Sequence, residues 1–121
     1  MMVLWIERIG RYCIALLFIA GTLQKLVDPD ATQALLAMRG WPVWLMWPAL
    51  ALNAVGAALL VAGILPGPVG ITLALYCGVT SYFHFLPDDP WQMSIVVKNW
   101  AIAGGLLMLA ARGAERGFWR P

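Results

Sequence analysis

Charged residues are scarce in this sequence. Only 12% of its 121 residues are Asp, Glu, Lys or Arg, whereas a soluble domain carries about 25%. Residues 41–86 contain none of these four, and 62% of the whole chain is hydrophobic. These proportions exclude an ordinary soluble surface and predict an integral membrane protein that contacts the lipid bilayer. The small net charge of +2 gives no reason to expect nucleic acid as a partner.

Histidine and cysteine are also rare. A single histidine, His84, excludes bis-histidine haem ligation, and two cysteines are too few for a four-cysteine iron–sulfur cluster. We therefore expect no metal site and no cofactor that belongs to this chain alone. His84 with Asp88 and Asp89 is a weak metal pattern, because aspartates beside prolines are typical of solvated turns. Cys13 and Cys77 fall at similar predicted depths, so they are either a redox pair or two buried, unreactive thiols.

The apolar residues form four segments that can cross a bilayer. A crossing needs about 20 apolar residues, and the motif "LPGP" at residues 65–68 divides the uncharged region into two such segments. We predict an all-α, four-helix transmembrane bundle that forms a single domain over residues 1–121, with helices at residues 5–27, 43–65, 68–86 and 92–112. After the Asp28-Pro29 stop, we expect a short surface helix that Asp30 or Thr32 caps and Gly40 ends.

The basic residues predict an orientation. Four crossings place both termini on one side of the membrane, and that side carries Arg8, Arg11, Arg112, Arg116 and Arg120. By the positive-inside rule, this side is predicted to be the cytoplasmic face of the membrane. The connector "SYFHFLPDDPWQ", residues 81–92, then lies on the outer side, where we expect His84 to end its helix.

Polar side chains gather toward the outer ends of the predicted helices. Ammonium and imidazole groups there can donate hydrogen bonds to an anion or to a quinone headgroup, while an aromatic ring flanks it. The candidate ligand- or quinone-binding residues are Lys25, His84, Lys98, Asn99 and Trp91. The alternative is that Lys25 pairs with Asp28, Lys98 pairs with a loop acid, and His84 lies at a wet interface.

Two further features concern packing and charge. Small residues in the last predicted helix, namely Ala101, Gly104 and Gly105, permit another helix to approach closely. Asp88 and Asp89 are predicted to hold their carboxylates near Lys25 and Lys98, which lowers the cost of keeping ammonium groups at the membrane edge.

Two long stretches, "LLFIAGTLQKLVDPDATQALLAMRGWP" and "FHFLPDDPWQMSIVVKNWAIAGGLLMLA", resemble the DoxX family of small four-helix bacterial membrane proteins. The family is named for its likeness to a membrane subunit of a thiosulfate–quinone oxidoreductase, and some members are linked to redox or oxidative-stress assemblies. The resemblance favours quinone or redox partners, and we predict an accessory subunit of a larger redox or electron-transfer complex rather than an enzyme. The alternatives are a quinone-linked oxidoreductase subunit with a site at the periplasmic end, and a protein that handles lipids or small solutes.

Overall fold

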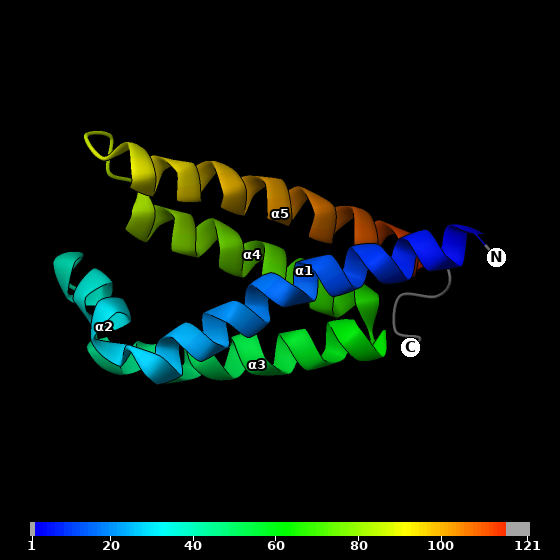
Figure 1. The fold of residues 1–121 in the computed structure, drawn as a ribbon, viewed down its shortest axis with the longest axis horizontal. Helices are drawn as coiled ribbons and strands as arrows, with labels where there is room; N and C mark the ends of the chain where they lie inside the picture. The colour runs from blue at the N-terminus through cyan, green and yellow to red at the C-terminus, as the bar shows by residue number, and fades with distance from the viewer. Residues whose placement is uncertain (1, 116–121) are drawn as a thin grey trace. The chain divides into compact units, whose positions relative to one another are not determined.

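The computed structural model describes residues 2–115, and every regular element in that range is a helix (Figure 1). The elements are α1 (Met2–Val27), α2 (Pro29–Met38), the 3-10 helix η1 (Val43–Leu45), α3 (Met46–Ala62), α4 (Pro66–His84) and α5 (Pro90–Glu115). The all-α prediction is confirmed for this range, while Arg116 and Arg120 lie outside the described residues. The chain divides into two compact units, Met1–Gly63 and Ile64–Pro121, each described by itself below. A single domain over the whole chain stays a prediction.

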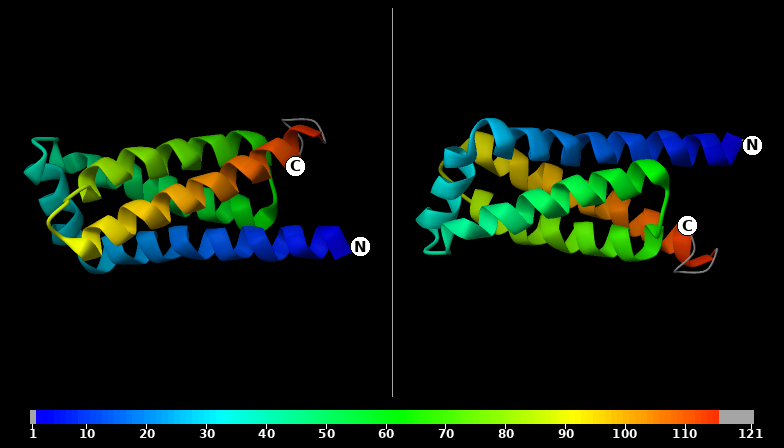
Figure 2. Two further views of the ribbon diagram at one scale, coloured as in Figure 1. Left: turned by 90° about the horizontal axis from the view of Figure 1, so that it is seen from above. Right: turned by 90° about the horizontal axis from the view of Figure 1, so that it is seen from below.

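The first unit is a hairpin of α1 and α3, which run in opposite directions, with α2 between them in sequence (Figures 1 and 2). The predicted break at Asp28-Pro29 is confirmed, because proline disfavours helical geometry in the residue before it. The prediction of a cap at Asp30 or Thr32 is wrong. Asp28 precedes the helix, and Pro29 occupies its first position, where a missing N–H costs nothing. Gly40, at φ +74°, follows the end of α2 as expected.

The boundary between α3 and α4 differs from the prediction by a few residues. We expected the helix to continue to residue 65, but α3 ends at Ala62 because Gly63 adopts a left-handed conformation with φ +74°. Its N–H donates to the Leu59 carbonyl at 2.9 Å and so satisfies one of the terminal acceptors of α3. The next helix begins at Pro66, two residues before the predicted start, with proline again at the first position.

The second unit is an antiparallel hairpin of α4 and α5, which lie side by side in all three ribbon views (Figures 1 and 2). The helices approach closely at Gly70, where an added Cβ atom would lie 2.6 Å from the Leu106 carbonyl oxygen. Of the predicted packing residues, Ala101 and Gly104 are exposed, and no other atom lies within 4 Å of a Cβ placed at Gly104. The α4–α5 contact therefore does not use Gly104. Packing of Ala101, Gly104 and Gly105 against another helix stays a prediction.

Two helical stretches among the described residues are long and apolar enough to cross a membrane, namely Val43–Ala62 and Pro90–Gly113. The helix α1 includes the charged residues Arg11 and Lys25. The helix α4 is 19 residues long and carries a row of polar side chains at every fourth position, namely Thr72, Tyr76, Thr80 and His84. Crossing by α1 and α4, and hence the four-helix bundle, remains a prediction.

Candidate functional site

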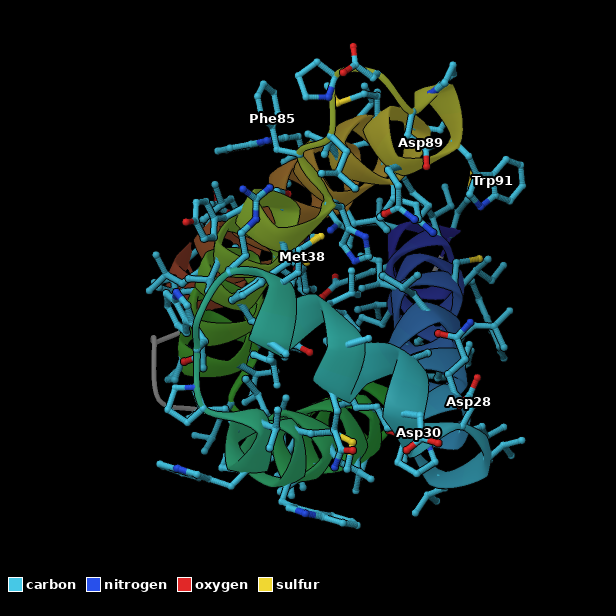
Figure 3. All side chains as sticks on the ribbon, turned by 90° about the vertical axis from the view of Figure 1, so that its left-hand side faces the viewer. Asp28, Asp30, Met38, Phe85, Asp89 and Trp91 are labelled. Atoms are coloured by element: carbon cyan, nitrogen blue, oxygen red, sulfur yellow. The ribbon has the colours of Figure 1, made fainter. Side chains whose placement is uncertain are left out.

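The five predicted ligand residues belong to both units. Lys25 lies in the last turn of α1, in the first unit, and is partly buried. The other four lie in the second unit, at the end of α4 and in the first half of α5: His84, Trp91, Lys98 and Asn99. Within that unit, Asn99 is buried, Lys98 is exposed, and the Trp91 side chain is 76% exposed and extends outward from the start of α5 (Figure 3).

His84 ends α4, as predicted, and links it to α5. Its ring nitrogen Nδ1 lies 2.6 Å from the Gln92 side-chain oxygen Oε1, across the non-helical connector of residues 85–89. An amide oxygen only accepts hydrogen bonds, so Nδ1 carries the proton and donates it. The second ring nitrogen, Nε2, is then a hydrogen-bond acceptor in the neutral ring and a donor once the ring is protonated.

Asn99 joins the polar row of α4. Its Nδ2 donates to the Thr80 hydroxyl oxygen at 3.3 Å. The hydroxyls of Thr80 and Ser81 in turn donate to the Cys77 carbonyl, at 3.1 and 2.8 Å. Such bonds to a carbonyl three or four residues back are a common way for hydroxyls to be satisfied inside an apolar helix pair. Of these bonds, the one from Asn99 to Thr80 joins α5 to α4, and the other two lie within α4.

Asp89 does not pair with a lysine of its own unit. Its Oδ1 accepts hydrogen bonds from the backbone N–H groups of Trp91, at 3.0 Å, and Gln92, at 3.3 Å. These bonds make Asp89 the N-cap of α5, beside the proline that starts the helix. Lys98 follows nine residues later, about 13 Å along the helix axis. The predicted pairing of Asp89 with Lys98 is therefore wrong, because the carboxylate satisfies the free N–H groups of the helix start instead.

The ion pairs of the alternative interpretation are also missing from the part of the chain that the structure describes. Within residues 2–115, Lys25 forms no ion pair with Asp28, and Lys98 forms none with Asp88. Asp28 lies at the corner between α1 and α2, with its side chain directed outward (Figure 3).

Arg11 is a residue whose role the sequence did not reveal. From α1, its Nη1 donates to the carbonyl oxygens of Leu60 and Val61, the latter at 3.4 Å, in the last turn of α3. The same nitrogen lies 2.7 Å from the position of a Cβ added to Gly63. The guanidinium thus occupies the electronegative end of α3, where a cation is favoured. The available signal was that Arg11 lies closest to the long apolar stretch of α1, beyond Glu7 and Arg8.

A second unexpected arrangement surrounds Gly21 of α1. A Cβ added there would lie 2.9 Å from Nδ2 of Asn53, which reaches across from α3, and 3.9 Å from the Lys25 ammonium nitrogen. Asn53 is only 2% exposed, and its Oδ1 has no hydrogen-bond partner among residues 2–115. Asn53 is the only strongly polar side chain within α3, and that isolation was the signal available in the sequence.

The two cysteines differ in exposure. Cys13 on α1 is exposed, Cys77 on α4 is buried, and both are free thiols. Their pairing as a redox couple stays a prediction. Across residues 2–115, no three side chains of the types His, Cys, Asp and Glu converge as ligands for a metal ion would.

One comparison with known proteins decides the family. The family model named DoxX matches residues 7–86, more than half of the chain. The chain belongs to the DoxX family. No curated protein and no solved structure matches the sequence. Membership in DoxX, together with the apolar helices, makes this chain a membrane protein, as the composition predicted.

Proposed function

We propose that this DoxX protein is a small accessory subunit of a larger redox or electron-transfer complex in the bacterial inner membrane. On this proposal α1, α3, α4 and α5 all cross the bilayer, both termini are cytoplasmic, and the chain carries no cofactor of its own. Its contribution is a helical surface against which other membrane subunits pack.

The observation that supports this proposal is the outward face of α5. Gly104 lies open on that face, with space around its Cα atom, and large apolar side chains flank it: Trp100, at 62% exposure, and Met108, at 75%. Lipid-facing apolar residues are ordinary in a membrane helix. An open glycine between large side chains is different, because it lets the backbone of a second helix approach closely, and van der Waals contact drives association inside a bilayer.

The test is purification in gentle detergent, with identification of the chains that accompany the tagged protein. Gly104→Leu should remove the partner chains while the variant itself remains folded, because the new Cβ meets no atom within 4 Å beyond the neighbouring residues and backbone of its own helix. Gly78→Leu, at a glycine of α4 whose added Cβ also meets no atom within 4 Å, is the control and should retain the partners. Retention of every partner by Gly104→Leu would contradict the proposal.

A second candidate function is that of a quinone-linked oxidoreductase subunit, and His84 is the observation that favours it. Because Nδ1 is held by Gln92, Nε2 is available to take a proton from a bound quinol or to donate one to a quinone carbonyl. The same purified complex separates the two candidates. If the protein is an accessory subunit, His84→Ala should leave both partner retention and quinone reduction by the complex nearly intact. If His84 performs chemistry, that variant should keep the partners and lose the activity.

A further inference from the structure

The first unit contains a small polar cluster inside its apolar hairpin. Gly21 and Lys25 lie one turn apart on α1, and Asn53 faces them from α3. The Asn53 Nδ2 and the Lys25 Nζ both lie within 4 Å of the position that a side chain at residue 21 would occupy. Both nitrogens are hydrogen-bond donors. The cluster therefore directs two donors, one of them charged, at the same small region.

The Lys25 ammonium points away from the end of its helix. Side chains of a helix lean toward its N-terminus, so a lysine in the last turn of α1 extends back along the helix toward Gly21. The partner helix offers no countercharge, because α3 contains neither Asp nor Glu. A partly buried cation without an anion is costly in an apolar environment, and so is the buried Asn53 Oδ1, which lacks a donor among the described residues.

We propose that this cluster binds the headgroup of an anionic lipid that also carries a free hydroxyl group. A phosphate oxygen would accept hydrogen bonds from the Lys25 ammonium and the Asn53 Nδ2, and the lipid hydroxyl would donate to the Asn53 Oδ1. Phosphatidylglycerol has both groups. Lys25 lies two residues before the end of α1, at the level where a crossing helix meets lipid headgroups. This site goes beyond the proposed role as an accessory subunit, and it rests only on the part of that proposal in which α1 crosses the bilayer.

Ligand identity is tested by thermal unfolding of the purified chain in a neutral detergent, with added dioleoyl-phosphatidylglycerol, dioleoyl-phosphatidylcholine or glycerol 1-phosphate. Phosphatidylglycerol should raise the midpoint temperature in a saturable way, since a ligand that binds only the folded state stabilises it. Phosphatidylcholine has a phosphate but no free hydroxyl and carries no net charge, so it should have little effect. Equal stabilisation by the two lipids would contradict the proposed site. Stabilisation by glycerol 1-phosphate equal to that by phosphatidylglycerol would contradict the assignment of the ligand as a lipid.

Variants locate the site within the molecule. Lys25→Met and Gly21→Ala should each weaken phosphatidylglycerol binding about tenfold or more, the loss expected for one charge-assisted hydrogen bond. Gly21→Ala acts by displacing the Asn53 amide. The matched controls are Arg8→Met, which removes an exposed cation of the same helix, and Gly10→Ala, where an added Cβ meets no atom within 4 Å. Both controls should bind the lipid as the parent does, and equal weakening by Arg8→Met would mean that surface charge alone attracts it.

Asn53→Asp separates binding from folding. Its carboxylate supplies Lys25 with a partner inside the protein, so the variant should unfold without lipid at a temperature at least equal to that of the parent. The new charge also repels a phosphate, and phosphatidylglycerol should no longer raise the midpoint temperature. A variant that is equally stable and still responds fully to phosphatidylglycerol would show that the cluster is not the binding site.

Discussion

Arg11 joins the two long helices of the first unit through a contact between a charge and a helix end. The last carbonyl groups of α3 have no partner within their own helix, and the guanidinium supplies donors for two of them. Gly63 is suited to this place for two reasons: it adopts φ +74° without strain, and it leaves room for the arginine head. A cation is thus accommodated in an apolar hairpin without an acidic partner.

Removal of this contact should destabilise the protein. Arg11→Met keeps much of the side-chain length but leaves the carbonyls of Leu60 and Val61 without their donor, so we expect the free energy of unfolding to fall by about 1–3 kcal/mol. Arg8→Met is the matched control, because Arg8 is exposed on the same helix and lies over the Trp5 ring at 5.2 Å. Thermal unfolding in detergent measures both variants. Equal midpoint temperatures for the two would show that Arg11 is no more important than a surface charge.

At the scale of elements, Gly70 is one of the glycines that let α4 and α5 approach closely. A Cβ at Gly70 would lie 2.6 Å from the Leu106 carbonyl oxygen and 3.1 Å from the Ala110 Cβ, and backbone atoms cannot move aside as a flexible side chain can. Gly70→Ala should therefore separate the helices locally and lower the free energy of unfolding by about 1–3 kcal/mol. Gly78→Ala, on the same helix but with open space, should be neutral or slightly stabilising, since alanine favours helix. The hypothesis fails if the midpoint temperatures of the two alanine variants coincide.

The elements could be predicted from the sequence to within a few residues, because local chemistry sets their ends. Asp28-Pro29 stops α1 whatever surrounds it. The end of α3 was placed three residues too late, since Ile64 and Leu65 are as apolar as the helix and only the conformation of Gly63 shows where it stops. The helix predicted over residues 68–86 ends two residues earlier, at His84. The bond from His84 to Gln92 was not predicted, because it depends on how the connector folds back.

The contacts between helices could not be predicted in the same way. Arg11 and Leu60 are 49 residues apart, and nothing near either residue indicates the other. The same holds for Gly21 and Asn53, which meet only once α1 and α3 form a hairpin. Asp89 shows the opposite case. Its position before Pro90 is a local signal for an N-cap, which the structure shows. The prediction of a lysine partner did not take this signal into account.

For the whole molecule, the number of crossings has a consequence that can be measured. If all four long helices cross, the corner between α1 and α2 and the junction between the two units lie on opposite sides of the membrane, with the junction on the side of both termini. The alternative is that only the two helical stretches that satisfy the length and composition test cross the membrane. Both termini then still share one side, and the corner between α1 and α2 lies on that same side. The junction between the two units lies on the opposite side. The location of the C-terminus alone therefore does not separate these topologies.

Single cysteines at the corner and at the junction do separate them. In a background of Cys13→Ala and Cys77→Ala, we would introduce Asp30→Cys at the exposed start of α2, Ile64→Cys at the exposed junction, or Arg120→Cys near the C-terminus. A maleimide that cannot cross the inner membrane should label Asp30→Cys in cells whose outer barrier has been permeabilised. It should label Ile64→Cys and Arg120→Cys only after the inner membrane is disrupted, because the arginines near the termini hold that side in the cytoplasm. Labelling of Ile64→Cys in intact cells, together with protection of Asp30→Cys, would contradict the four-helix topology and favour two crossings.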